Sequence, residues 1–396
     1  MIAPPGFSFS GVAAGLKKRG ALDLGAIVSD LPAAAAGVFT RNKFRAAPVL
    51  LTRRRVQAGH LMAILVNAGN ANACTGRQGA ADARRTSGAF ARALGVPAPS
   101  VGVCSTGVIG QRLPADRLIA GIPALVGAAR PDGVDDFAAA IMTTDTAPKV
   151  VAVAGNVGGR RVQVVGVAKG SGMIEPGMAT MLAFAVTDAA ADPAWLEAAL
   201  RRVTNRTFNR VTVDGDGSTN DTFLALAGGN AGNDPDAPAG LEDLLGEVAE
   251  GLALAIARDG EGSTKLVHVR VTGAASDGDA ERVAREIANS PLVKTALFGE
   301  SANWGRVVMA VGNTRARVRP ERVRIRFDEV TLVEGGLWAG AEAEQSVHAV
   351  MQRPELELGV DLGLGSGEAT LHTCDLSLDY IRINADYRAW KTRGRR

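Results

Sequence analysis

The sequence predicts a mixed α/β fold, built as a layered α/β sandwich. Segments with an apolar residue at every second position indicate half-buried strands, and apolar residues at helical spacing indicate helices. Other apolar runs show no alternation, which is typical of strands buried on both faces, so we expect helices to cover both faces of a sheet. No glycine-rich nucleotide-binding fingerprint follows a strand, which argues against a doubly wound nucleotide fold.

The strand predictions come from these two patterns. Apolar side chains alternate in 323–327, 356–362 and 376–380, which we expect to be antiparallel strands. The runs 63–66 and 162–167 are mainly apolar without alternation and are expected in the interior of a sheet. Each interior strand would deliver a polar or glycine-rich turn at its end, where functional groups can gather.

Helical spacing is clearest in 241–256, and this helix should end near Asp259 and Gly260. A second helix is expected to begin at Pro193 and to include Val203. At 396 residues, the chain exceeds the size at which one core usually stops growing, so we expect two or more packed units.

The composition excludes several classes of protein. No apolar run reaches the ~20 residues of a membrane helix. Net charge is +3, and the basic residues of 388–396 have no interleaved stripe of aromatics, so neither membrane nor nucleic acid is an expected partner. The cysteines Cys74, Cys104 and Cys374 are far apart and are expected to be buried, reduced thiols. Because the first residues also lack a secretory signal pattern, we expect a cytoplasmic protein.

Common catalytic and metal-binding motifs are missing. The four histidines are isolated, and neither a G-x-S-x-G elbow nor an H-E-x-x-H helix occurs. The segment that begins at Asp214 starts like a calcium loop, but Thr219 replaces the required glycine and Ala225 replaces the final glutamate. We therefore expect no calcium there, and interpret Asp214, Asp216, Asn220 and Asp221 as turn residues that cap backbone groups.

Thr180 lies where the glycine-rich loop of KGSGMIEPGMATML, residues 169–182, meets an apolar strand. On composition alone, a threonine that merely begins a strand is the more common case. The alternative is that its hydroxyl attacks the carbonyl of Ala179 and splits the chain. The freed α-amino group, with an ordinary pKa of about 7.7–8.0, would then accept the hydroxyl proton without any histidine.

These motifs resemble the ornithine acetyltransferase family, the glutamate N-acetyltransferases. The similarity extends in order from residue 11 to residue 387 and includes the segment around Thr180 as well as GVAAGLKKRG, NAGNANACTG, STGVIG, MTTDTAPK, TVDGDGSTNDT, DGEGSTKL, SPLVKTALFG and INADY. It implies Thr180 as nucleophile and cleavage after Ala179. Fragments 1–179 and 180–396 would share one interlocked core, with the oxyanion hole in the first.

The resemblance also implies roles for individual residues. It implies an oxyanion hole at Thr106 and Gly107, where the residues alone allow a plain turn before a helix that includes 113–119. It implies that substrate is bound by Thr146, Lys169, Thr180, Glu261 and Asn384. From the residues alone, Lys169 can equally be a surface lysine and Glu261 a charge at a helix end. The family usually has serine or threonine where this chain has Ala389, so the end of the pocket departs from the family pattern.

The implied reaction transfers acetyl from N-acetylornithine to glutamate without a metal or redox cofactor, in an assembly of two copies of each fragment. Some family members also use acetyl-CoA as donor, and the sequence does not decide this point. Two alternatives stay open: an amidohydrolase or aminopeptidase on the same scaffold, and an uncleaved binding protein without activity.

Overall fold

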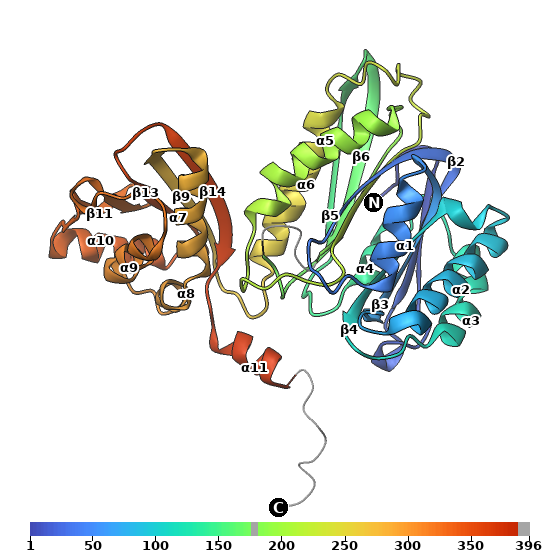
Figure 1. Cartoon of the computed structure of the whole chain (residues 1–396), viewed down its shortest axis with the longest axis horizontal. Coiled ribbons are helices and arrows are strands. Elements are labelled where there is room, and N and C mark those ends of the chain that lie inside the picture. The colour runs from blue at the N-terminus through green and yellow to red at the C-terminus, as the bar shows by residue number, and fades with distance from the viewer. Residues whose placement is uncertain (176–180, 387–396) are drawn as a thin grey trace, which may run out of the picture. The chain divides into compact units, whose positions relative to one another are not determined.

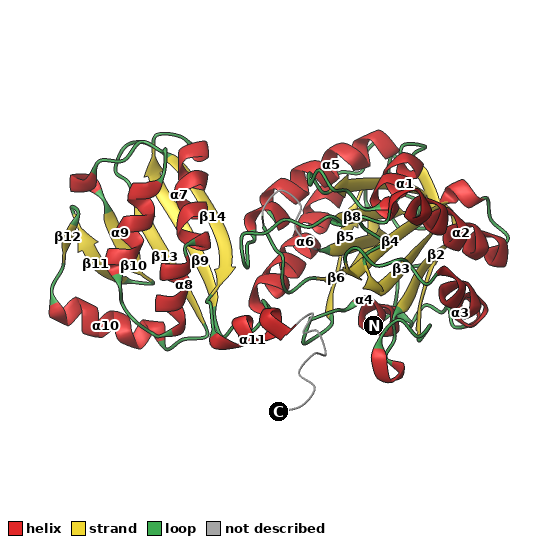
Figure 2. Ribbon diagram, turned by 60° about the horizontal axis from the view of Figure 1, so that its bottom comes forward, coloured by secondary structure: helices red, strands yellow, loops and turns green. Residues whose placement is uncertain are grey.

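The computed structural model describes residues 1–175 and 181–386, which form two compact units. Unit 1 comprises 1–209 and 216–256, and unit 2 comprises 210–215 and the described residues from 257 onward. Each unit combines a sheet with several helices (Figures 1 and 2), which confirms the predicted α/β class. Among the described helices, none combines the length and the apolar character needed to cross a membrane.

Unit 1 is built on an eight-stranded sheet of order β4-β3-β2-β8-β7-β6-β5, with β1 beside β2. The pairs β3–β4 and β7–β8 are parallel, and the other pairs are antiparallel. Its strands are β1 (Phe7–Val12), β2 (Leu24–Phe39), β3 (His60–Asn70), β4 (Val101–Val108), β5 (Lys149–Val157), β6 (Arg160–Lys169), β7 (Leu182–Thr187) and β8 (Thr222–Ala227).

Both faces of this sheet are covered. Every residue of β7 and β8 is buried, and because neighbouring side chains of a strand point to opposite faces, neither face can be open to water there. The predicted interior runs 63–66 and 162–167 lie in β3 and β6, as expected. On one face, the Phe137 ring of α4 packs edge-on against Phe9 and Phe184, with ring centroids 5.5 and 5.4 Å away.

The helices of unit 1 are α1 (Ala47–Val56), α2 (Gly76–Leu94), α3 (Ala115–Gly127), α4 (Val134–Ile141), α5 (Pro193–Arg206) and all but the last two residues of α6 (Leu241–Arg258). The predicted helices at 193–203 and 241–256 are confirmed as α5 and α6. Asp192 caps α5, because its carboxylate accepts from the N–H groups of Ala194 and Trp195, both at 2.9 Å.

Unit 2 has a six-stranded sheet of order β12-β11-β10-β13-β9-β14. Its strands are β9 (Leu266–Ala274), β10 (Arg324–Phe327), β11 (Val330–Glu334), β12 (Leu337–Trp338), β13 (Glu355–Asp361) and β14 (Gly367–Cys374). Its helices are α7 (Asp277–Asn289), α8 (Pro291–Phe298), α9 (Trp304–Asn313), α10 (Ala341–Met351) and α11 (Leu378–Asp386).

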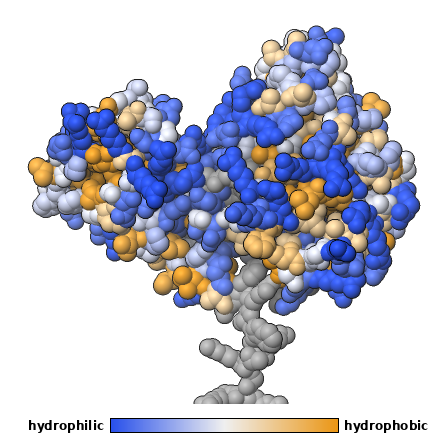
Figure 3. Space-filling view, in the orientation of Figure 1, coloured by the Kyte–Doolittle hydropathy of each residue, from blue (hydrophilic) through white to orange (hydrophobic). Residues whose placement is uncertain are grey.

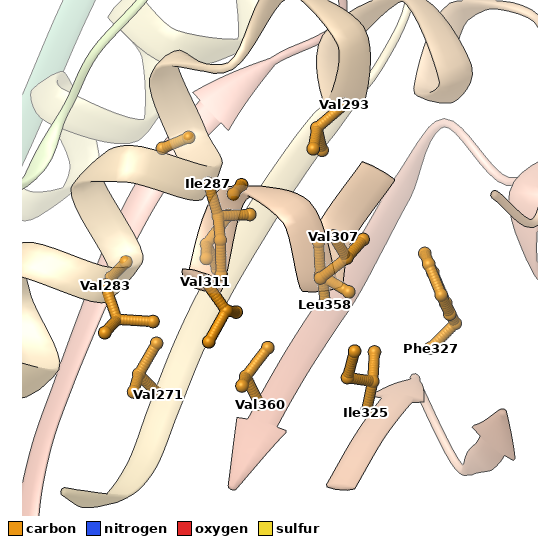
Figure 4. Close-up of a cluster of buried hydrophobic side chains, with 14 of the residues drawn as sticks. Val271, Val283, Ile287, Val293, Val307, Val311, Ile325, Phe327, Leu358 and Val360 are labelled. Atoms are coloured by element: carbon orange, nitrogen blue, oxygen red, sulfur yellow. The ribbon is translucent and has the colours of Figure 1, made fainter. Parts of the chain in front are cut away.

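One face of the unit 2 sheet carries the core. Figure 4 shows Ile325, Phe327, Leu358 and Val360 on the strands beneath the valine and isoleucine side chains of α7 and α9. The predicted alternation at 323–327 and 356–362 is confirmed, because these apolar side chains are buried. The antiparallel prediction holds for β13 against β10 but is wrong against β9, which is parallel to β13. The long helical connection between β9 and β13 permits this parallel pairing.

Two other expectations are wrong. Residues 376–380 do not form a strand, because β14 ends at Cys374 and α11 begins at Leu378. The Ser377 hydroxyl accepts from the N–H groups of Asp379 and Tyr380 and so caps this helix, while Leu378 is exposed. Cys104 and Cys374 are buried as expected, but Cys74 is exposed in the loop after β3.

The face in Figure 3 is mainly hydrophilic, with scattered apolar patches.

Candidate active site

The end of β4 carries the predicted oxyanion hole. Thr106 is buried, and Gly107 lies opposite Gly69 of β3. The φ of Gly107 is 129°, and a Cβ added there would lie 2.3 Å from the Gly69 carbonyl carbon and 2.5 Å from the Asn70 nitrogen. Only glycine fits this close approach of two backbones. The pairing is irregular here, since Asn70 faces both Thr106 and Val108, and such bulges re-aim backbone groups near active sites.

The neighbouring residues Asn220 and Asp221 tie this strand end to β7. The Asn220 amide donates to the carbonyls of Ala71 at 2.7 Å and of Ser105 at 2.8 Å. Asp221 Oδ1 accepts from the N–H of Met181 at 3.1 Å. The prediction that these two residues cap backbone groups is therefore confirmed. Through them, the residue before Thr106 is connected to the residue after Thr180, although Ala179 and Thr180 themselves lie outside the described residues.

Asp221 is an unusual buried acid. Its side chain has no exposed surface, and its Oδ2 has no hydrogen-bond partner among the described residues. The nearby Thr40 hydroxyl gives its proton to the Ser218 carbonyl at 2.6 Å. Burial raises the pKa of Asp221 well above its ordinary value, against the opposing effect of the Met181 N–H. The carboxyl group is therefore held in its protonated form over a wider pH range than an exposed aspartate.

This burial predicts a pH effect that Asp221→Asn should remove. The unfolded chain loses the Asp221 proton near an ordinary pKa of about 3.9, whereas the folded protein keeps it to higher pH. Between these two pKa values, the free energy of unfolding should fall by about 1.4 kcal/mol per pH unit as the pH rises. Asparagine retains the acceptor for Met181 and cannot ionise, so urea unfolding at several pH values should show a flatter profile.

Asp216→Asn is the matched control, because Asp216 lies in the same loop but is exposed. This variant keeps the buried Asp221 and should therefore retain the fall in stability with rising pH. An Asp221→Asn protein whose stability fell with pH as steeply as the parent would contradict the buried, protonated acid.

A second buried acid, Asp145, organises the surroundings of Lys169. Its carboxylate accepts from Lys149 Nζ at 2.8 Å and from the Gly170 N–H at 2.7 Å, and its Oδ2 is 4.0 Å from Lys169 Nζ. Burial acts to raise the pKa of Asp145, but Lys169 and Lys149 outweigh it and hold that pKa below its ordinary value. Lys169 is itself 2% exposed. The interpretation of Lys169 as a surface lysine is therefore wrong.

Thr146 follows Asp145 directly, in the loop between α4 and β5, and is exposed. Four site residues belong to unit 1, namely Thr106, Gly107, Thr146 and Lys169. Asp145 connects two of them, because it contacts Lys169 and directly precedes Thr146 in the chain. A cation beside a short polar loop can bind the carboxylate of a small substrate.

Glu261 and Asn384 are brought together in unit 2. The Asn384 amide donates to Glu261 Oε2 at 2.8 Å and to the carbonyl of Tyr380 at 3.1 Å. Glu261 is 9% exposed. It lies in the turn before β9, and the adjacent Gly262 has a φ of 68° and approaches the backbone of Tyr380 closely. A carboxylate held in this way can bind an ammonium group. Ala389 lies outside the described residues.

Sequence reasoning missed the importance of Asp145 and underestimated Asp221. Both residues stand in segments that resemble family motifs, MTTDTAPK and TVDGDGSTNDT, but no spacing rule assigns chemistry to either. The available signal was only an acid within a mainly small and polar segment.

Comparison with known proteins identifies the family. A sequence model of the ArgJ family matches residues 8–389. The chain belongs to the ArgJ family. The arginine biosynthesis bifunctional protein ArgJ of Geobacter sulfurreducens is 53% identical over 389 residues, which are 97% of this chain and 99% of the relative. The family resemblance drawn from the motifs is thus confirmed.

Two solved structures are similar to this chain in sequence. The arginine biosynthesis bifunctional protein of Bacillus halodurans is 42% identical, with 52% of this chain and 98% of that chain covered and a TM-score of 0.49. The ornithine acetyltransferase of Mycobacterium tuberculosis, crystallised with ornithine, is 44% identical, with 44% of this chain and 93% of that chain covered and a TM-score of 0.39.

Proposed function

We propose that this chain transfers an acetyl group from N-acetylornithine to glutamate through an acetyl ester on Thr180. Membership of the ArgJ family over nearly the whole chain carries this proposal, because the curated relatives are named as enzymes of arginine biosynthesis. The expectation of an acetyltransferase of arginine biosynthesis agrees with that membership, and ornithine, the expected product, is bound by one solved relative.

The nucleophile would arise by self-cleavage. The Thr180 hydroxyl attacks the Ala179 carbonyl carbon, the peptide C–N bond breaks, and the nitrogen takes the hydroxyl proton. Water then hydrolyses the ester, which leaves a carboxylate on Ala179 and a free α-amino group on Thr180. That amine has an ordinary pKa of about 7.7–8.0, so it can serve as base for its own hydroxyl.

Acetyl transfer then takes two steps. Thr180 Oγ attacks the acetyl carbonyl of N-acetylornithine, with the oxyanion held at Thr106 and Gly107, and ornithine leaves with the proton as its free amine. The amino group of glutamate attacks the acetyl ester and releases N-acetylglutamate. Lys169 would bind a substrate carboxylate and Glu261 an ammonium group, with Asn384 orienting Glu261.

The sheet of unit 1 supports an interlocked pair of fragments. Strand β6 pairs with β7, so that Lys169 faces Leu182, and β2 pairs with β8. Each of these pairs joins one strand before the proposed cut with one strand after it. Separation would expose buried strands, and the fragments 1–179 and 180–396 should therefore stay associated after cleavage.

The rest of the proposal concerns partners. The reaction as written uses small-molecule substrates and requires neither a metal nor a redox cofactor. Acetyl-CoA is a candidate second donor. We also propose a cytoplasmic location and an assembly of two copies of each fragment.

Two measurements test the function. Intact mass should show two chains, the second beginning at Thr180. Purified protein given N-acetylornithine should then form N-acetylglutamate only when glutamate is present. Release of acetate without glutamate would support an amidohydrolase, and an uncut chain without turnover would support a binding protein.

Glu261→Gln should weaken substrate binding and leave self-cleavage intact. Glutamine keeps the shape and the acceptor for Asn384 but removes the charge that would pair with an ammonium group. A charged hydrogen bond of this kind contributes roughly 1.5–3 kcal/mol, so the KM for N-acetylornithine should rise about tenfold or more. Steady-state kinetics on the cleaved protein measures this. Glu342→Gln, at an exposed position of α10, is the control, and an unchanged KM in Glu261→Gln would remove Glu261 from the binding site.

A further inference from the structure

A cleft of about 440 Å³ lies between α1 and α2 in unit 1. One wall comes from α1 and the other from α2, whose lining residues recur about once per helical turn. The loop that precedes α1 and the loop that precedes α2 complete the rim. The lining residues are Lys43, Phe44, Arg45, Ala47, Leu50, Leu51, Arg54, Cys74, Thr75, Gly76, Ala80 and Arg84. A volume of this size is typical of small-molecule sites.

All the charged residues that line the cleft are basic. Its lining includes four cations and no acid, and none of the four forms an ion pair with any described residue. These cations are Lys43, Arg45, Arg54 and Arg84. By contrast, the next residue along α2, Arg85, is paired with Asp116. Four basic side chains without a neutralising carboxylate favour an anionic ligand.

The backbone adds further donors at the same cleft. Helix α2 begins at its rim with Gly76, and the side chain of its N-cap Thr75 accepts no hydrogen bond from the helix. Helix α1 begins at the rim too, but its first two residues supply no free donor, because the Ala47 N–H donates to the Asn72 carbonyl at 3.3 Å and Pro48 has no N–H. First-turn N–H groups have no partner within a helix and attract anions. Cys74 and Gly76 have φ values of 57° and 61° on either side of Thr75, at −107°. Alternating φ signs turn successive N–H groups toward one side, as in anion-binding nests.

Part of the cleft is apolar. Phe44 is 71% exposed and Leu50 is 51% exposed, although both are large apolar side chains. An exposed aromatic ring beside arginines provides a surface on which a planar base can stack. We propose that the cleft between α1 and α2 binds a nucleotide-type ligand, whose phosphates contact the four cations and whose base packs against Phe44 and Leu50.

The loop before α2, which lines the cleft with Cys74 and Thr75, is hydrogen-bonded to the end of β4 and the residues that follow it. The Ala71 N–H donates to the Val108 carbonyl at 3.1 Å, and the Gly110 N–H donates to the Ala73 carbonyl at 3.0 Å. Two kinds of molecule carry the phosphates and the base that this cleft would bind. One is a nucleotide-carried acyl donor such as a coenzyme A thioester, and the other is a free nucleotide. The proposal does not depend on transfer from N-acetylornithine.

Calorimetric titration of the full protein with coenzyme A and with ADP tests this inference. At least one of the two should bind, with an affinity that falls as salt is added. The double variant Arg54→Ala, Arg84→Ala should bind it at least about tenfold more weakly. Arg92→Ala, an exposed arginine on α2 outside the cleft, should bind like the parent. All three proteins should transfer acetyl from N-acetylornithine at the same rate, because none of these residues belongs to the acetyl-transfer site.

Failure of both compounds to bind, or binding that the double variant leaves unchanged, would overturn the proposal while leaving the acetyl-transfer assignment intact. The two ligands also separate the sources. Tighter binding of coenzyme A, with a raised KM for acetyl-CoA in the double variant, supports an acyl-donor site. Equal or tighter binding of ADP, without use of acetyl-CoA, supports a site for free nucleotide.

Discussion

Thr180→Ala is expected to yield a single uncut chain of 396 residues without acetyltransferase activity. The substitution removes the only group that the proposed mechanism uses to attack Ala179 and, later, the acetyl carbonyl. Loss of a catalytic nucleophile lowers kcat by a factor of up to about 10⁶ in well-studied enzymes, so no measurable transfer should remain. Denaturing electrophoresis and intact mass measure cleavage, and N-acetylglutamate formation measures transfer.

Thr180→Ser is the matched control, because it keeps the hydroxyl and removes only a methyl group. It should be cut at the same bond and retain transfer, although more slowly if the methyl group restricts the nucleophile. Cleavage of Thr180→Ala after Ala179, or transfer by that protein at the rate of the parent, would assign the nucleophile to another residue. The fold should be unchanged in both variants, as checked by thermal unfolding.

Several elements were predictable because one side of each faces water. Strands β10 and β13 and helices α5 and α6 each bury one face, so their apolar residues repeat with the period of the element. Alternation at 376–380 led to the wrong prediction of a strand, because the apolar residues there do not share a buried face. The helix cap supplied by Ser377 decides the conformation there, and a cap depends on a few hydrogen bonds that periodicity does not register.

The candidate site was predictable only in part, for a related reason. The family resemblance singled out Gly107 for the oxyanion hole, whereas its close approach to the backbone of Gly69 is known only from the structure. The importance of Asp145 and Asp221 depends on burial and on hydrogen bonds from Gly170 and Met181, which lie 25 and 40 residues away in the sequence. Nothing in the local sequence distinguishes such an acid from one that faces water in a turn.

The boundaries between the two units could not be predicted from sequence patterns either. Unit 2 includes 210–215 in addition to its C-terminal segment, and unit 1 resumes at 216. The segment 210–215 belongs to unit 2 because of a long-range backbone contact, in which Val211 forms an isolated β-bridge with His372 of β14. Six residues carry too little periodicity to reveal a strand-like contact of this kind.

Gly107→Ala should lower kcat for acetyl transfer by about 10²–10³, the usual cost of losing one oxyanion donor. The added Cβ would lie 2.3 Å from the Gly69 carbonyl carbon, so the backbone of β4 must move away from β3 just where the oxyanion would bind. KM should change much less, because the substrate groups would be held by Lys169 and Glu261. Rates must be normalised to the cleaved fraction from intact mass, since cleavage also passes through a tetrahedral intermediate.

Gly110→Ala separates this effect from simple backbone strain. Gly110 also has a positive φ, 78°, but an added Cβ would meet nothing within 4 Å. This variant should lose stability by about 1 kcal/mol and keep the kcat of the parent. If Gly107→Ala raised KM and left kcat unchanged, Gly107 would contact the substrate without stabilising the oxyanion. If instead both variants lost kcat equally, strain in the loop after β4, and not the closeness of Gly107 to Gly69, would limit the reaction.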